Sequence, residues 1–195
     1  ELYRSLFRNP KMPFYFVQIS PYLYSKRTSD PKKHTEELLP GFWEAQEKCL
    51  SIPNTGMVVT TDLVDKLSDI HPSYKWEVGR RLALIALAKD YRKKVVFEGP
   101  KYKAMKVIGD KVELSFINRG GALKSIDGQP LTWFTVAGDN GVFFPAKAEI
   151  KGKKVIVWSD EVQNPKEVQF AWSELAMPNL FNTAGLPAHP FRTGR

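Results

Sequence analysis

The chain has 195 residues, 43% of them hydrophobic, which is enough apolar material for a folded core. Lysine and arginine total 29 against 21 acidic residues, a net charge of +8, but the basic residues are scattered and accompany no recognition motif. The charge therefore indicates a solvated basic surface and no nucleic-acid partner, and no apolar run reaches the roughly 20 residues that cross a membrane, so we expect no membrane partner either.

Buried strands alternate with helices in the first half of the chain. An almost wholly apolar run at 13–19 predicts a strand buried on both faces, as in a parallel sheet, and 56–62 predicts a second one. A helical pattern surrounds Trp43, and another covers 73–89 directly after Pro72. This order is typical of the last strands and helices of an α/β sheet. Because two parallel strands cannot bury such a sheet alone, we expect the chain to start within this domain.

Cys49 is the only cysteine of the chain, and it lies in the helical pattern around Trp43. A single cysteine excludes an intrachain disulfide and a thiolate-rich metal site. We interpret Cys49 as a packed core thiol and not as a nucleophile. His189 is too isolated in sequence for a metal site, so we expect neither a metal nor another cofactor.

From about residue 95 onward, short apolar alternations are separated by glycine-containing turn signals, a pattern that predicts antiparallel hairpins. The segments 112–117 and 154–158 alternate their faces, which favours a small β-sandwich. The last residues contain too many prolines for regular structure and too many apolar side chains for a free tail, so we expect them to pack back on the body. The predicted division is an α/β part, a β-sandwich and a C-terminal segment, at residues 1–94, 95–178 and 179–195.

The five tryptophans are candidates for stacking on a sugar, but their positions favour burial. Trp133, Trp158 and Trp172 lie on strand-like patterns and are interpreted as core residues. Trp43 and Trp76 lie on the helices that flank the predicted sheet, and we expect these two to be buried as well.

Asp69 and His71 lie in the loop after the second predicted parallel strand. Open α/β sheets place their sites beyond the carboxyl ends of the strands. A histidine there can take the proton of a serine hydroxyl and later give it to the leaving alcohol, while a carboxylate holds its tautomer. As a bare pair these residues are weak evidence, because a histidine before a proline at a helix start is more often a capping or packing residue.

Several separate stretches give this pair its context: residues 13–18, 52–57, 69–72 and 75–83 in the first half, and 168–172, 179–182 and 185–193 in the second. In this order they resemble the sialate O-acetylesterase family of SGNH hydrolases, and the resemblance covers nearly the whole chain. It implies the C-terminal part of a flavodoxin-like SGNH hydrolase sheet followed by a small antiparallel β-sandwich domain.

The resemblance implies hydrolysis of O-acetyl esters on sialic acid or other acetylated glycans by a serine, a histidine and an aspartate. It assigns His71 as the acid and base and Asp69 as the carboxylate. The wider SGNH pattern is Asp-x-x-His, and position 68 is Ser68. Asp62 and Asp65 therefore remain alternatives for the carboxylate, with Asp62 as the second choice.

The nucleophilic serine of such a site is not found in this sequence. It contains no G-x-S-x-G motif, and Ser20, which follows the first predicted strand, has no glycine-rich elbow around it. The expected partners are therefore an acetylated carbohydrate and an N-terminal chain or segment that carries the serine. The alternative is a noncatalytic carbohydrate-binding fragment. The resemblance also implies an extracellular, periplasmic or lysosomal location.

Overall fold

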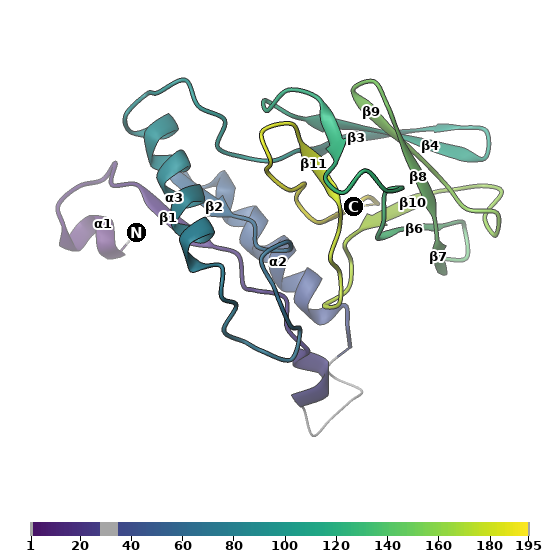
Figure 1. The fold of residues 1–195 in the computed structure, drawn as a ribbon, viewed down its shortest axis with the longest axis horizontal. Helices are drawn as coiled ribbons and strands as arrows, with labels where there is room; N and C mark the ends of the chain where they lie inside the picture. Colours follow the sequence, from purple (N-terminus) through teal and green to yellow (C-terminus); the bar gives the residue numbers. More distant parts are fainter. Residues whose placement is uncertain (1, 28–34, 195) are drawn as a thin grey trace.

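A computed structural model of the chain describes residues 2–27 and 35–194. Helices around a short sheet form one region, and antiparallel strands form the region beside it (Figure 1). The elements of the first region are α1 (Leu2–Leu6), β1 (Phe14–Val17), η1 (Tyr24–Arg27), α2 (Leu38–Lys48), η2 (Cys49–Ser51), β2 (Thr55–Val58) and α3 (Lys75–Lys89). The strands of the second are β3 (Lys101–Ile108), β4 (Lys111–Ile117), β5 (Leu123–Ser125), β6 (Phe134–Ala137), β7 (Phe143–Pro145), β8 (Lys147–Lys151), β9 (Lys154–Trp158), β10 (Glu167–Phe170), β11 (Leu180–Asn182) and β12 (Phe191–Arg192).

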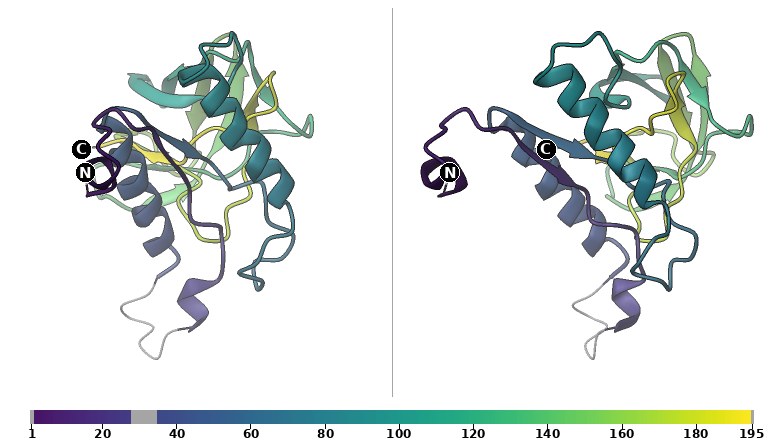
Figure 2. Two further views of the ribbon diagram at one scale, coloured as in Figure 1. Left: turned by 90° about the vertical axis from the view of Figure 1, so that its left-hand side faces the viewer. Right: turned by 60° about the vertical axis from the view of Figure 1, so that its left-hand side comes forward.

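The predicted parallel pair is confirmed, since β1 and β2 run parallel in a register from Phe14 opposite Thr55 to Val17 opposite Val58. Helix α3 packs on both strands (Figure 2). The packing is close at Gly56, where an added Cβ would lie 2.7 Å from a methyl of Ile85 on α3. Helix α2 is tied to the end of β1, because the Trp43 indole donates to the Ile19 carbonyl at 2.7 Å.

The prediction that the first strand is buried on both faces is wrong. Strand β2 is buried throughout, but Phe14 of β1 is 47% exposed. On this side β1 borders an open apolar cavity of about 390 Å³, which no described element fills. Cys49 lines the same cavity and is exposed, so the interpretation of Cys49 as a packed core thiol is also wrong.

The second region consists of antiparallel sheets with the strand orders β3-β4-β9-β8, β12-β10-β6-β7 and β11-β5. The predicted hairpins are confirmed between β3 and β4 and between β8 and β9. Their turns contain Gly109 and Gly152, each with a φ of 62°, a conformation that glycine adopts without steric cost. Alternate residues of β4 and β9 point inward and join residues of β6 and β10 in one core: Val112, Leu114, Val136, Val155, Val157, Val168 and Phe170.

The C-terminal residues return between the two regions (Figure 1). Strand β11 pairs with β5 and β12 pairs with β10, so the expectation that prolines prevent regular structure here is wrong for these short stretches. The prolines of this segment lie outside both strands. Arg192 donates to both carboxylate oxygens of Glu44 on α2 at 3.1 Å, which ties the end of the chain to the first region.

The tryptophan expectations hold only in part. Trp43 and Trp172 are buried as predicted. Trp76 is 68% exposed, because it lies on the outer face of α3, away from the inward-facing Glu77 and Ile85. Trp133 is 39% exposed and has a positive φ of 63°, which places it outside the strands. In the part of the chain that the structure describes, the helices are too short or too polar to pass through a bilayer.

Candidate functional site

The loop between β2 and α3 brings Asp69 and His71 together beyond the carboxyl end of β2. Oδ1 of Asp69 accepts the backbone N–H of His71 at 2.8 Å and lies 3.6 Å from its Nδ1. The His71 side chain is 85% exposed and that of Asp69 58%. The carboxylate thus shapes the turn and faces the ring nitrogen, which leaves Nε2 directed away from the pair and open to a reacting hydroxyl.

Asp65 is engaged at the far side of the same loop. It accepts a hydrogen bond from the Ser73 hydroxyl, and this bond lowers the pKa of the Asp65 carboxyl. The contact links the residues that precede and follow the Asp69–His71 turn, so Asp65 closes the loop.

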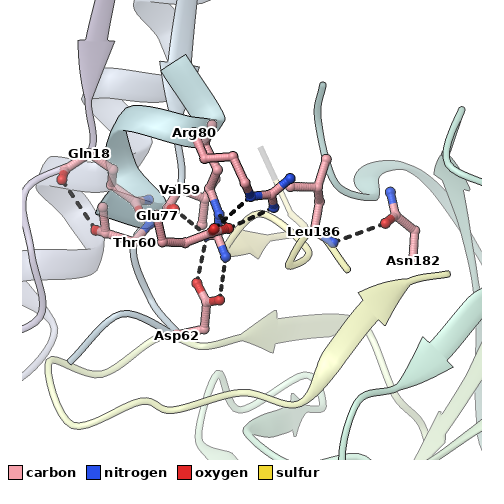
Figure 3. Close-up of polar contacts among 9 residues, drawn as sticks. Gln18, Val59, Thr60, Asp62, Glu77, Arg80, Asn182 and Leu186 are labelled. Atoms are coloured by element: carbon pink, nitrogen blue, oxygen red, sulfur yellow. Dashed lines mark hydrogen bonds and ion pairs between the residues drawn. The ribbon is translucent and has the colours of Figure 1, made fainter. Parts of the chain in front are cut away.

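Asp62 forms a salt bridge with a buried arginine. Arg81, which is 4% exposed, donates Nη1 to Asp62 Oδ1 at 2.8 Å and Nη2 to Oδ2 at 2.5 Å. The same guanidinium donates to Glu77 of α3 and to the carbonyl of Val59, both at 2.8 Å (Figure 3). Burial by itself lowers the pKa of Arg81, but the hydrogen bonds to Asp62 and Glu77 raise it above its usual value.

This cluster bears on the choice of carboxylate. Both oxygens of Asp62 are held by one guanidinium, a geometry that neutralises the carboxylate and fixes its position. Asp69, in contrast, lies beside the imidazole of His71. The arrangement favours Asp69 over Asp62 as the partner of the histidine, and it shows Arg81 joining the end of β2 to the first turn of α3, on either side of the loop that carries the pair.

Sequence reasoning missed a polar link between the two strand ends. Oε1 of Gln18, a residue that is 2% exposed, accepts the backbone N–H of Thr60 at 3.1 Å, and the Thr60 hydroxyl donates to the Gln18 carbonyl (Figure 3). A glutamine at the end of an otherwise apolar strand was the signal for it. The hydroxyl of Ser20 is buried with no hydrogen-bond partner in the described part of the chain.

No family model matches the chain, and a search of curated proteins found no match. Among solved structures, a carbohydrate acetylesterase from Xanthomonas citri is similar over 99% of this chain, with a TM-score of 0.89 and 35% sequence identity. The chain spans 43% of the length of that enzyme. The mixed α/β architecture with several antiparallel sheets therefore matches part of an esterase-like fold, and the similarity supports a carbohydrate esterase-like family for this chain.

Proposed function

We propose that this chain supplies the acid–base pair of a carbohydrate O-acetylesterase, with His71 as the proton carrier and Asp69 as its carboxylate. The similarity to the carbohydrate acetylesterase, over nearly the whole chain and at 35% identity, carries the proposal. The exposed imidazole of His71 beside Asp69, after the carboxyl end of a parallel strand, is the geometry that supports it.

In the proposed reaction a serine hydroxyl attacks the acetyl carbonyl while His71 accepts the hydroxyl proton. The tetrahedral intermediate collapses, and His71 gives that proton to the departing sugar oxygen. Water then attacks the acetyl-serine with His71 again as base, so acetate leaves and the serine is restored. Asp69 keeps the proton of the imidazole on Nδ1 and stabilises the imidazolium that forms in each step.

The nucleophile belongs, in this proposal, to an N-terminal chain or segment outside residues 1–195 that completes a flavodoxin-like SGNH sheet. Two features of β1 support this. Its described pairing is with β2 alone, and its partly exposed phenylalanines border the apolar cavity of about 390 Å³. A parallel strand needs cover on both faces to remove such side chains from water.

The proposed substrates are O-acetyl esters of sialic acid or of other acetylated glycans, and the proposed location is extracellular, periplasmic or lysosomal. A fluorophosphonate that reacts with activated serines tests the nucleophile assignment when the labelled protein is mapped by mass spectrometry. We expect the label on a serine outside residues 1–195 and a strong loss of labelling in His71→Ala. Labelling of a serine within this chain would contradict the assignment. Sugar binding without labelling or turnover would instead favour a noncatalytic carbohydrate-binding role.

A further inference from the structure

A polar cavity of about 420 Å³ lies between α2, the start of β3 and the C-terminal segment. This cavity is not the proposed ester site. Its residues on α2 lie in the turns that lead into the amino end of β2, whereas His71 lies in the loop that follows the carboxyl end of β2. A smaller cavity of about 90 Å³ beside it is lined by Gly56 at the start of β2 and shares Lys101 and His189 with it. The two hollows thus open at the opposite end of the parallel strands.

His189 forms the floor of this cavity. The residue is 4% exposed, its backbone N–H donates to the Pro100 carbonyl at 3.0 Å, and its Nδ1 lies 2.7 Å from Oε2 of Glu47. The Glu47 carboxylate binds the ring at Nδ1, so Nε2 is the ring nitrogen left for a ligand. Nε2 has no partner in the part of the chain that the structure describes, although His189 lines both cavities.

Among the described residues, the charged side chains around the cavity are paired except at one position. Lys101 lies 2.9 Å from Glu47, and Arg192 lies 3.1 Å from Glu44. Although burial by itself raises the pKa of Glu47, His189 and Lys101 lower it to about 2, so this carboxylate is ionised. Four basic side chains, Lys48, Lys101, Arg119 and Arg192, face three carboxylates, Glu44, Glu47 and Glu98, which leaves one cation in excess.

Arg119 supplies that excess charge. It is exposed at the rim, in the loop after β4, and has no ion-pair or hydrogen-bond partner among the described residues. A free guanidinium matches a carboxylate with two parallel hydrogen bonds. The aromatic side chains of Tyr102 and Phe191, stacked on each other with centroids 4.7 Å apart, form an apolar part of the same wall.

We propose that this cavity is a binding site for an acidic sugar, a pyranose bearing one carboxylate, separate from the ester-hydrolysing pair. Arg119 binds the carboxylate, Nε2 of His189 forms a hydrogen bond with a ring hydroxyl, and the aromatic wall contacts the apolar edge of the ring. The volume, the apolar part of the wall and the one cation that has no partner among the described residues fit a small-molecule site for a monoanion.

The test is calorimetric titration of the protein with D-glucuronate, and with D-glucose, acetate and inorganic phosphate as probes. We expect saturable glucuronate binding at least ten times tighter than that of each of the other three. Arg119→Gln should weaken glucuronate binding at least tenfold, whereas Arg92→Gln, which changes an exposed arginine without a described partner outside the cavity, should leave it unchanged.

The outcomes separate this site from the proposed hydrolysis. His71→Ala should keep full glucuronate affinity, and Arg119→Gln should keep wild-type turnover of a neutral acetyl ester. Absence of saturable glucuronate binding, equal binding of acetate or phosphate, or insensitivity to Arg119→Gln would overturn the acidic-sugar site. Loss of neutral-ester turnover in Arg119→Gln would overturn its separation from the reacting groups.

Discussion

Asp69 caps the backbone N–H of His71 at 2.8 Å and has the same oxygen 3.6 Å from the imidazole Nδ1. One carboxylate therefore fixes the turn and also lies within ion-pair distance of the ring. Neither side chain is buried, so the pair is accessible to a substrate and to a serine brought in beyond the strand end. This relationship, together with the similarity to an acetylesterase, underlies the proposed function.

Asp69 and Asp62 are expected to respond differently to substitution. Asp69→Asn keeps an oxygen that can accept the His71 N–H, but it removes the charge that stabilises the imidazolium. We expect kcat to fall on the order of 10²- to 10⁴-fold while the melting temperature stays near that of the wild type. Steady-state kinetics of acetate release and thermal melting measure the two quantities.

Asp62→Ala should act on stability instead. It leaves the guanidinium of Arg81, 4% exposed, without its bidentate partner, and breaking a buried pair in this way costs about 3 kcal/mol of unfolding free energy. Chemical denaturation measures the loss. A stable Asp62→Ala protein that has lost turnover, beside an active Asp69→Asn, would reverse the assignment of the carboxylate.

Gly99 is expected to tolerate no side chain. A Cβ at this position would overlap the backbone carbonyl of Pro187 in the C-terminal segment, and a backbone group cannot move aside without displacing its neighbours. We expect Gly99→Ala to lower the free energy of unfolding by about 2 kcal/mol or more, as overpacking does.

Gly79→Ala is the matched control. Gly79 lies on the exposed face of α3 with nothing within 4 Å of an added Cβ, so this substitution should raise the free energy of unfolding by about 0.5 to 1 kcal/mol. Equal effects of the two substitutions, measured by denaturation, would contradict the close approach.

Glu47 is expected to make folding depend on pH in the acid range. Burial opposes its ionisation, but His189 and Lys101 lower its pKa from 4.5 to about 2. Between these values the unfolded chain binds a proton that the folded chain does not, so the stabilisation is present above pH 4.5 and is lost as the pH falls toward 2. The unfolding free energy, measured from pH 2 to 6, should therefore rise less steeply with pH in Glu47→Gln than in the wild type. Glu149→Gln, at an exposed residue of β8, should leave the slope unchanged.

Local patterns were sufficient for much of the fold. Apolar runs predicted the parallel strands, Pro72 marked the residues just before α3, and glycine turns marked two hairpins. The same patterns overestimated burial at Trp76 and Cys49. A helix-flanking position suggests a covered side chain, but cover depends on which elements pack there, and that information is not local.

The long-range polar contacts could not be predicted from the sequence. Arg81 reaches Asp62 across 19 residues, and His189 reaches Glu47 across 142. Neither pair leaves a periodic signal, since each depends on how separate elements meet. The position of Asp69 and His71 after a strand was predictable because strand ends and loops are local features. The salt bridge between Asp62 and Arg81 could be seen only in the structure.

The most direct test of the proposed function is the rate of acetate release from an acetylated sugar by the protein and by its His71→Ala variant. Lys75→Ala, an exposed substitution at the start of α3, serves as the control. We predict that His71→Ala folds like the wild type and loses kcat/KM by on the order of 10³-fold or more, whereas Lys75→Ala stays near the wild-type value. A folded His71→Ala protein with near-normal turnover would contradict the role of His71 as the acid and base.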